Sequence, residues 1–408
     1  MSENKHFLIV DNDGEILKLI KIILEKAGHR VTTLNSSVQA LKEIEKIHPD
    51  CVISDLMMPQ MDGLVLYENI KKNKKIVLPK FIVISIKQYD FDRRRALKSG
   101  IDGYIAKPIN IDTFLTEVSS IIESGIVIQF WGVRGTLPVP GKETVRYGGN
   151  TNCVTMKIAN RHFFIFDAGT GIKALSNHMM KHHSPLSAKI FITHPHYDHI
   201  QGLPFFVPLY KKGNDFEIFG PDNDGLDIEK SLAGQMDSIY FPVTIKEFSA
   251  NIKFHNLVEE EFRVGNVKVK TLYLTHPGKC LGYQLKYDNK IFCYITDNEI
   301  PLENSEAYSQ FHINRLIQFI QNADVLIMDA TYSDGEFSQK VFWGHSCVSR
   351  VVEIADQAKV KLLCLYHHDL DQTDDDIDKK LEMAKSLLLQ KNSTTICIAP
   401  KEGDDIKI

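Results

Sequence analysis

One stretch of the chain, Thr193-His194-Pro195-His196-Tyr197-Asp198-His199-Ile200-Gln201-Gly202, places three imidazoles and one carboxylate within six residues. It follows an apolar run at residues 189–192, which predicts a buried strand. In an extended segment, residues two apart point the same way, so we expect His194 and His196 to hold one ion together. The side chains expected to face a second ion, just past the turn, are Asp198 and His199. Mixed nitrogen and oxygen donors suit borderline divalent metals, so the stretch predicts a metal site rather than a polar loop that happens to be rich in histidine.

Further candidate ligands follow later apolar runs. The runs and the residues after them are Val267–Leu274 before His276, Ile291–Ile295 before Asp297, and Leu362–Leu365 before His367 and His368. A histidine or aspartate directly after a strand can reach a site at one edge of a sheet. Any one of them alone is typical of a loop, but three in series after the first stretch indicate ligands that come from separate strands.

The composition is that of an ordinary globular protein. The chain has 408 residues, of which 43% are apolar and 25% charged, and its formal net charge is -4. This length predicts two or three domains, and the charge argues against a dedicated nucleic-acid surface. No apolar run reaches membrane-spanning length, and the first residues lack the pattern of a signal peptide. The seven cysteines include no C-x-x-C pair and are expected to be reduced thiols of a cytoplasmic protein.

Residues 1–125 alternate between strand-like and helix-like patterns. The expected strands are Phe7–Val10, Val31–Thr33, Cys51–Ser54, Phe81–Ser85 and Tyr104–Ala106, and the expected helices include Glu15–Lys26, Ser37–Lys46 and Asp112–Glu123. Such alternation predicts an α/β fold with a doubly wound parallel sheet. The polar residues that close the strands are Asp11, Asp55, Ser85 and Lys107. Functional groups in these sheets gather at the carboxyl ends of strands, so we expect one acidic pocket with a hydroxyl and an amine.

This N-terminal part resembles a response-regulator receiver domain with a flavodoxin-like fold, expected to span residues 1–124. The matching motifs are Phe7-Leu-Ile-Val-Asp-Asn-Asp13, Ser54-Asp-Leu-Met-Met-Pro59, Met61-Asp-Gly63, Ile84-Ser85 and Tyr104-Ile-Ala-Lys-Pro108. The resemblance implies that Asp55 accepts a phosphoryl group from a sensor histidine kinase. The other implied roles are a Mg²⁺ site at Asp11, Asn12 and Asp55, phosphoryl contacts from Ser85 and Lys107, and Tyr104 as the switching aromatic.

One position departs from the receiver pattern. Receivers usually carry a second acid directly after the first, and this chain has Asn12 there. A neutral amide removes one charge from a hard-cation site, so weaker Mg²⁺ binding is expected unless Asp13 compensates. The alternative is a receiver that serves only for docking. Because a phosphoryl group adds about -1.5 to -2 charge, we hypothesise that phosphorylation of Asp55 alters the second domain through the receiver surface.

The remaining residues, 125–408, resemble the metallo-β-lactamase fold, a four-layer αββα sandwich. More narrowly, they are similar to the phosphodiesterase branch that includes ribonuclease Z and class III cyclic-nucleotide phosphodiesterases. The resemblance implies two divalent metal ions, with Zn²⁺ favoured and Mn²⁺ or Fe as alternatives. The implied ligands are His194, His196 and His276 for one ion, Asp198, His199 and His367 for the other, and Asp297 as a bridge that also counts as catalytic.

Other residues are expected to act around this centre. The segment Trp343-Gly-His345-Ser-Cys precedes a helix, and in the phosphodiesterase branch a G-H-S segment supplies a histidine near the leaving group. We therefore expect His345 to be the proton donor. Asp167 is either an acceptor that orients the metal loop or a helix N-cap. The remaining candidates are Arg134 and Asn150 for phosphate contact, and His368, which either supports the ligand beside it or is merely adjacent.

These resemblances imply a two-component response regulator whose output is a binuclear-metal hydrolase. Residues 125–408 carry 30 basic and 35 acidic residues, so a large polyanion such as transfer RNA is disfavoured. The expected substrate is a small phosphodiester, either a cyclic nucleotide or a short oligonucleotide. Two alternatives stay open, namely hydrolysis of a lactone, lactam or thioester, and a metal-stabilised docking module without catalysis. By resemblance we also expect a homodimer, and we expect no membrane partner.

Overall fold

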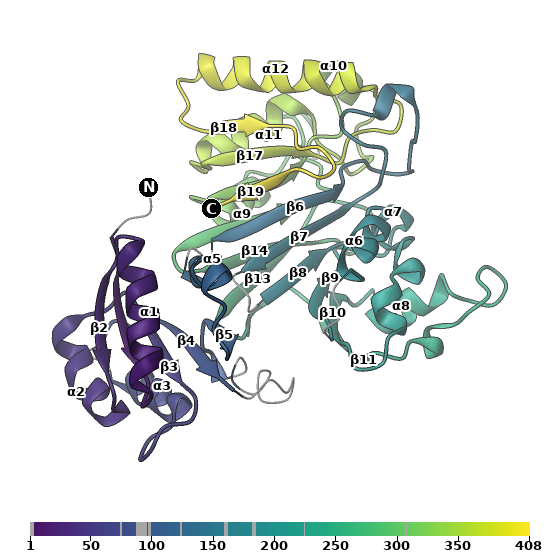
Figure 1. The fold of residues 1–408 in the computed structure, drawn as a ribbon. Helices are drawn as coiled ribbons and strands as arrows, with labels where there is room; N and C mark the ends of the chain where they lie inside the picture. Colours follow the sequence, from purple (N-terminus) through teal and green to yellow (C-terminus); the bar gives the residue numbers. More distant parts are fainter. Residues whose placement is uncertain are drawn as a thin grey trace. The chain divides into compact units, whose positions relative to one another are not determined.

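The computed structural model describes residues 4–73, 76–86, 96, 99–122, 125–158, 162–181, 185–223, 225–306 and 308–408. The chain forms two compact units, one built mainly from residues up to Ile126 and the other mainly from Val127 onward (Figure 1). The expected helix end at Glu123 lies outside the described residues. In the part of the chain that is described, no helix is both long and apolar enough to cross a bilayer.

The first unit is built on a five-stranded sheet in the order β2-β1-β3-β4-β5. Its strands are β1 (His6–Val10), β2 (Arg30–Leu34), β3 (Cys51–Asp55), β4 (Lys80–Ser85) and β5 (Gly103–Ala106), and its helices are α1 (Gly14–Lys26), α2 (Ser37–Ile47), α3 (Gly63–Lys72) and α5 (Ile111–Ile122). All four strand pairings are parallel. The predicted doubly wound parallel sheet is thus confirmed, while helix α3 was not expected from the sequence.

Both faces of this sheet are covered, which explains its nearly continuous apolar strands. In β1, Phe7 and Ile9 pack into one hydrophobic cluster with residues of α1 and α5. Leu8 and Val10 pack into a second cluster with residues of α2 and α3. The alternation follows from the period of two in a strand, and it leaves the carboxyl ends of the strands as the place where polar groups can collect.

The second unit contains two seven-stranded sheets. One has the order β11-β10-β9-β8-β7-β6-β19, made of β6 (Ile126–Gly132), β7 (Cys153–Ile158), β8 (His162–Phe166), β9 (Ser187–Phe191), β10 (Asp215–Pro221), β11 (Asn251–Leu257) and β19 (Asp405–Lys407). The other has the order β12-β13-β14-β15-β16-β17-β18, made of β12 (Glu261–Val264), β13 (Val267–Tyr273), β14 (Leu281–Tyr287), β15 (Lys290–Ile295), β16 (Val325–Asp329), β17 (Leu362–Tyr366) and β18 (Ile396–Ile398). The second sheet is mixed, with antiparallel pairs from β12 to β15 and parallel pairs from β15 to β18.

Helices cover the outer face of each sheet (Figure 1). Beside the first sheet lie α6 (Ile172–Met179), α7 (Tyr197–Ile200) and α8 (Ile228–Gly234), and beside the second lie α9 (Gln310–Ile320), α10 (Asp334–Phe337), α11 (Val348–Gln357) and α12 (Asp374–Gln390). Short 3₁₀ helices occur at η1 (Lys142–Thr144), η2 (Leu203–Phe205), η3 (Val207–Tyr210) and η4 (Ile245–Glu247). The layers are helix, sheet, sheet and helix, and they confirm the predicted metallo-β-lactamase sandwich.

Aromatic side chains fill the space between the two sheets. Phe191 of β9 meets Tyr283 of β14 edge-on, with ring centroids 5.0 Å apart. Phe166 of β8 lies 5.0 Å from Phe292 and 5.3 Å from Tyr294, both on β15. Pairs of this kind each add about 0.5–1.5 kcal/mol beyond their buried area. The sheets are therefore held in a fixed relation, and so are the loops at their edges that carry the candidate ligands.

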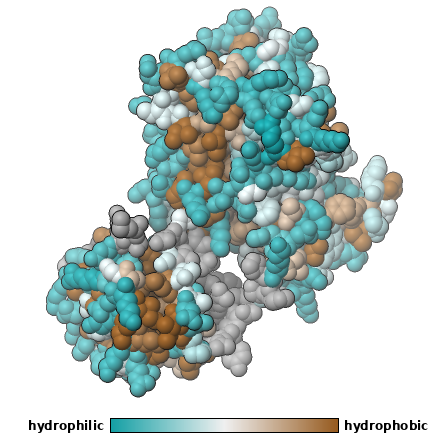
Figure 2. Space-filling view, turned by 45° about the horizontal axis from the view of Figure 1, so that its top comes forward, coloured by the Kyte–Doolittle hydropathy of each residue, from teal (hydrophilic) through white to brown (hydrophobic). Residues whose placement is uncertain are grey.

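The outer surface is mostly hydrophilic, with separate hydrophobic patches on the face shown in Figure 2. Most of the large apolar side chains of the described residues are buried, and a minority are exposed. Single exposed apolar residues are ordinary, whereas neighbouring ones mark surfaces that contact something.

Candidate metal centre

Each candidate ligand lies just beyond the end of a strand or in the short helix that follows it. His194 and His196 follow β9, His276 follows β13, Asp297 follows β15, His367 follows β17, and Asp198 and His199 lie in α7. Strands β15, β16 and β17 are parallel, so their carboxyl ends reach the same edge of their sheet. The structure brings all seven predicted ligands together there.

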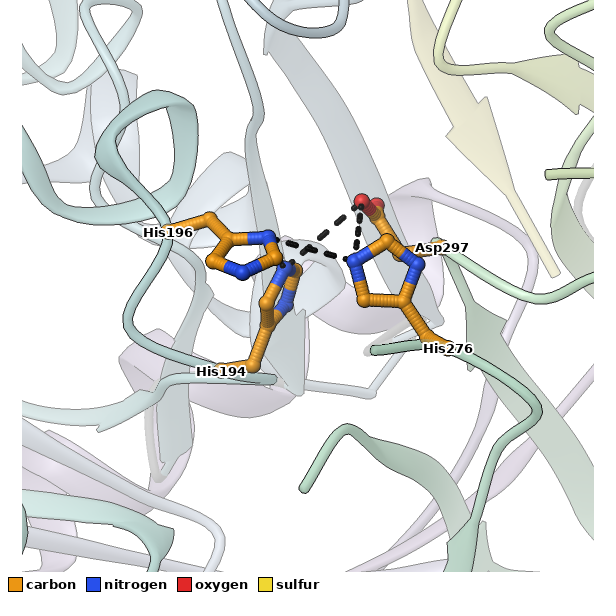
Figure 3. A group of neighbouring side chains, drawn as sticks. All are labelled: His194, His196, His276 and Asp297. Carbon is orange, nitrogen blue, oxygen red and sulfur yellow. Dashed lines mark hydrogen bonds and ion pairs between the residues drawn. The ribbon is translucent and has the colours of Figure 1, made fainter. Parts of the chain in front are cut away.

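The first cluster joins three imidazoles and one carboxylate, which point toward one another (Figure 3). His196 Nδ1 lies 2.8 Å from His194 Nε2 and 3.1 Å from His276 Nε2. Asp297 Oδ2 lies 3.7 Å from the Nε2 atoms of both His194 and His276. Nitrogen atoms this close, together with a carboxylate oxygen, match the donors that Zn²⁺ and similar ions take.

The second cluster shares Asp297 with the first. Its Oδ1 atom lies 3.1 Å from His199 Nε2 and 3.1 Å from His367 Nε2. Asp198 Oδ2 lies 3.2 Å and 3.1 Å from the same two nitrogens. Asp297 therefore turns one carboxylate oxygen to each cluster, which is the geometry that a bridging ligand requires.

The electrostatics of the cluster residues fit a cation as well. Burial disfavours the charged form of His194 and holds its pKa well below the usual range. Asp297 is also buried, yet its pKa is well below its usual range because His199 and His367 favour the carboxylate. The carboxylates of Asp198, Asp297 and Asp167 outweigh burial at His199 and hold its pKa well above the usual range. Neutral imidazoles and ionised carboxylates are the forms that bind metals, so His194 and Asp297 are already in their ligand forms. At His199 the surrounding carboxylates favour a positive charge, which a bound divalent ion would supply in place of the proton.

Three residues at strand ends hold the left-handed backbone conformation. Asp167 after β8 has φ 58°, Asp297 after β15 has φ 54°, and His367 after β17 has φ 58°. Residues other than glycine adopt this region rarely, although aspartate and histidine do so more often than most. Strain of this kind collects at functional sites, where the surrounding structure imposes it. The same turn thus aims two ligands and one supporting carboxylate into the centre.

Asp167 supports the metal loop. Its Oδ2 atom lies 2.8 Å from His199 Nδ1 and accepts a hydrogen bond of 3.0 Å from the Tyr294 hydroxyl. Its Oδ1 atom accepts the backbone N–H of Thr193 at 2.8 Å. Helix α6 is capped by Gly171, so the alternative role of Asp167 as helix N-cap is wrong. A carboxylate on the far nitrogen of a ligating histidine fixes the ring and leaves Nε2 free for the ion.

Asp329 was missed from the sequence, although it gives the same signal as the predicted ligands. It closes the apolar strand β16 and is fully buried. Its Oδ2 atom lies 2.7 Å from His345 Nδ1. Although burial acts to lower it, the pKa of His345 is raised to about 9 by this carboxylate. The ring of His345 stacks on His367 with centroids 4.8 Å apart, so the predicted proton donor stands beside the second cluster.

Three more groups near the second cluster were also missed. The Asn152 side-chain amide donates to Asp198 Oδ2 at 3.2 Å, and the backbone N–H of Thr136 donates to the same oxygen at 2.8 Å. Thr331 Oγ1 lies 3.0 Å from His367 Nδ1 and donates to Asp329 Oδ1 at 2.8 Å. Asparagine and threonine carry no pattern that marks them as ligand supports, so only the fold reveals them.

The structure does not place Arg134 and Asn150 at the centre, and the prediction of phosphate contact is wrong for both. Arg134 is fully buried and donates through Nε to the Gly148 carbonyl at 3.1 Å, while its Nη2 pairs with Asp374 at 3.4 Å. Asn150 donates through Nδ2 to Glu402 Oε2 at 2.8 Å. The hydrogen bonds of these polar groups hold loops together. A local sequence pattern cannot distinguish this role from substrate binding.

His368 is buried and takes no part in either cluster. Its backbone N–H donates to Val133 at 3.1 Å, and its carbonyl accepts from Gly135 at 2.9 Å. Burial, with Lys380 and Arg134 nearby, holds the pKa of His368 well below its usual range. The backbone hydrogen bonds of His368 thus position the segment that carries His367. Of the two predicted roles, mere adjacency to the ligand fits His368 better than a supporting contact of its side chain.

In the first unit, the carboxyl ends of the strands of the five-stranded sheet form the expected acidic pocket. Lys107 Nζ lies 2.8 Å from Asp11 Oδ2 and 3.1 Å from Asp55 Oδ1. Burial raises the pKa of Asp55, against the lowering effect of Lys107. Asp13 caps helix α1, since its Oδ1 accepts the backbone N–H groups of Glu15 at 2.8 Å and Ile16 at 3.4 Å. Ser85 is buried at the end of β4, and Tyr104 is half-buried on β5.

The comparison with protein families assigns both units. The family described as Beta-lactamase superfamily domain matches residues 162–368, half of the chain. The chain belongs to this family. The family described as Response regulator receiver domain matches residues 7–119, and the first unit is a receiver domain.

Individual relatives match one unit each. The alkaline phosphatase synthesis transcriptional regulatory protein PhoP of Bacillus subtilis is 30% identical over 119 residues, which cover 29% of this chain and 49% of PhoP. Ribonuclease Z of Halalkalibacterium halodurans is 28% identical over 243 residues, which cover 48% of this chain and 75% of the enzyme. The metallo-β-lactamase fold protein YhfI of Bacillus subtilis covers 70% of this chain and 100% of its own, with TM-score 0.51 and 16% identity, which shows the shared fold. The chain spans about half the length of the response regulators that it matches first.

Proposed function

We propose that the protein is a response regulator whose second unit is a binuclear-metal hydrolase of small phosphodiesters. The observation that carries the proposal is the position of Asp297. Its Oδ1 lies 3.1 Å from His199 and His367, and its Oδ2 lies 3.7 Å from His194 and His276. One carboxylate shared by two ligand clusters is the arrangement that a paired-ion centre needs.

A pair of bound divalent ions supplies a nucleophile by lowering the pKa of water and neutralises charge on a phosphoryl group. The protein's own residues do the rest. Asp198, His199 and His367 are buried and hold the inner side of the centre closed to solvent, while His196 is exposed on the outer side. We therefore infer that a substrate reaches the centre past His196.

His345 is proposed to donate the proton that the leaving oxygen takes. Its Nδ1 atom is held by Asp329, which leaves the other ring nitrogen free to face a substrate. A raised pKa, about 9, keeps this imidazole protonated at neutral pH. A poor leaving group such as an alkoxide depends on that proton, whereas a nitrophenolate leaves without it.

The size of the substrate is inferred from charge. Residues 125–408 carry 35 acidic and 30 basic residues, and a long polyanion would be repelled rather than held. The relative ribonuclease Z is named for acting on RNA, and we infer that this chain shares its phosphodiester chemistry with a smaller substrate.

The receiver domain is proposed to control the hydrolase through phosphorylation of Asp55 by a histidine kinase, with Mg²⁺ at Asp11, Asn12 and Asp55. Lys107 already bridges Asp11 and Asp55, so a phosphoryl group on Asp55 would replace a carboxylate–amine pair with a bulkier anion. Ser85 and Tyr104, on the adjacent strands β4 and β5, are the residues we expect to rearrange in response.

The test uses the full chain loaded with Zn²⁺ or Mn²⁺, assayed on bis-p-nitrophenyl phosphate and on a panel of cyclic nucleotides. We expect metal-dependent turnover of at least one diester, which is lost in Asp297→Asn and kept in a matched surface variant, His312→Ala, on helix α9. A well-folded, metal-loaded chain that turns over a lactone or thioester but no diester would contradict the proposal.

A further inference from the structure

Among the described candidate ligands of the metal centre, His196 is the most exposed. Of the others, His276 is partly buried, whereas His194, Asp198, His199 and His367 are buried. His196 Nδ1 and His276 Nε2 lie 3.1 Å apart. The exposed His196 thus lies at the solvent side of the centre, and the His276 side chain beside it is 3% exposed.

Large exposed aromatic side chains are adjacent in sequence to residues of the site. Tyr197 directly follows the ligand His196 and is 72% exposed. Phe342 and Trp343 are 69% and 60% exposed, and they immediately precede Gly344 and His345. Exposed aromatic rings cost solvation free energy, and several beside one site mark a surface that contacts a partner molecule.

The loop that carries Trp343 is held rigidly against the centre. The two carboxylate oxygens of Glu299, itself 4% exposed, accept the backbone N–H groups of Phe342 at 3.0 Å and Gly344 at 2.9 Å. The Gly344 carbonyl accepts from His276 Nδ1 at 3.0 Å. One buried acid therefore fixes the backbone on both sides of Trp343, and a metal ligand fixes the next residue.

The backbone of this loop is also strained, so the exposed rings are not explained by a relaxed surface loop. Phe342 has φ 70°, a conformation that aromatic residues rarely adopt, and Gly344 has φ 83°. A Cβ atom at Gly344 would lie 2.3 Å from His276 Nδ1, so only glycine fits there. A loop kept this close to the ligands, at a cost in strain, is expected to present its side chains for a purpose.

We propose that the exposed indole of Trp343 stacks on a planar nucleobase next to the scissile phosphodiester, so that the substrate is a nucleotide diester. This inference rests on the hydrolase function proposed above and names its substrate class. Every base offers a π-face, so a rigid indole binds nucleotides with little preference for sequence. Lys340 Nζ lies 5.9 Å from the Trp343 ring centroid and pairs with Asp369 at 3.0 Å, which helps to fix the indole.

The binding test uses tryptophan fluorescence of the full chain. The chain has two tryptophans, and the other, Trp131, donates to Thr155 Oγ1 at 3.0 Å within the sandwich. AMP is expected to quench the emission, while ribose 5-phosphate, which has the phosphate without the base, is not. The quenching should disappear in Trp343→Phe. Calorimetric titration should show AMP binding weakened about 5- to 150-fold in Trp343→Ala and partly restored in Trp343→Tyr.

The kinetic test compares two esters with the same leaving group, thymidine 5′-(p-nitrophenyl phosphate) and methyl p-nitrophenyl phosphate. Trp343→Ala should raise KM for the thymidine ester about 5- to 150-fold and leave KM for the methyl ester and kcat for both nearly unchanged. Phe311→Ala, which removes an aromatic ring of similar exposure on α9, should change neither.

The outcomes separate the two proposals. Equal effects of Trp343→Ala on both esters, or AMP and ribose 5-phosphate that behave alike, would overturn the stacking site while the hydrolase stands. Base-dependent quenching in a chain that hydrolyses no diester would instead overturn the hydrolase and leave a nucleotide-binding site. Circular dichroism of each variant excludes unfolding as the cause.

Discussion

The two units each gather carboxylates at the carboxyl ends of strands, but they balance the charge differently. In the receiver, Lys107 lies 2.8 Å from Asp11 and 3.1 Å from Asp55, so an amine neutralises the pair. In the second unit, imidazole nitrogens surround Asp198 and Asp297 at 3.1 to 3.7 Å. An ammonium is a permanent charge, whereas an imidazole can be a neutral metal ligand.

This difference separates a switch from a catalyst. A pocket that is neutralised by its own lysine is stable without a resident ion, and it can gain and lose a phosphoryl group. A cluster of facing imidazoles and carboxylates is satisfied only when cations occupy it. The comparison predicts that changes in one site will leave the chemistry of the other intact, apart from any regulatory coupling.

The largest effect is expected from breaking the metal centre alone. Asp297→Asn keeps the shape of the side chain but removes the bridging charge, so we expect the bound metal to fall below two ions per chain. Diester turnover should fall by more than about 10³-fold. Phosphorylation of Asp55 by a small phosphodonor should proceed as in the unaltered chain. Elemental analysis and turnover assays measure the first two, and retention of both metals with full activity would refute the bridging role.

His345→Ala tests the proton donor without removing a ligand. For a cyclic nucleotide, whose leaving oxygen needs a proton, we expect kcat to fall about 10²- to 10³-fold. For bis-p-nitrophenyl phosphate the loss should be much smaller, because nitrophenolate leaves unprotonated. His312→Ala serves as the surface control. Equal losses on both substrates would point to a structural role for His345.

Asp167→Asn weakens the support of His199 while every ligand stays in place. Because Asp167 accepts from His199 Nδ1, its loss should lower metal affinity about 10- to 100-fold. Competition with a chelator measures the affinity. Unchanged affinity would show that the Asp167 carboxylate does not support metal binding through His199.

Asn12→Asp sharpens the receiver side of the comparison. A second acid beside Asp11 adds one negative charge to the Mg²⁺ site, so Mg²⁺ should bind about tenfold more tightly. Metal content and turnover of the second unit should not change. Mg²⁺ affinity can be followed by calorimetry, and no gain would show that Asn12 lies outside the cation's reach.

Much of the fold was predictable because apolar runs in the sequence indicate strands. The runs before Asp11, Asp55, His194, Asp297 and His367 are strands β1, β3, β9, β15 and β17. The ligands themselves were predictable because the carboxyl ends of strands converge. Asp329 could have been found by the same rule, since it closes the run Val325–Met328.

Other parts of the site could not be predicted, for a physical reason. Arg134 and Asn150 look like phosphate contacts in a turn-rich stretch, but their partners Asp374 and Glu402 are far away in sequence. Glu299 holds the Trp343 loop across a shorter separation of 43 residues. Pairs of this kind depend on how the chain closes on itself, and no local pattern encodes them.

The central claim is that one carboxylate bridges two ions, and anomalous diffraction from crystals of the purified, metal-loaded chain tests it most directly. We expect two peaks about 3.5–4 Å apart, one among His194, His196, His276 and Asp297, and the other among Asp198, His199, His367 and Asp297. A single peak, or two peaks with Asp297 bound to only one of them, would contradict the account.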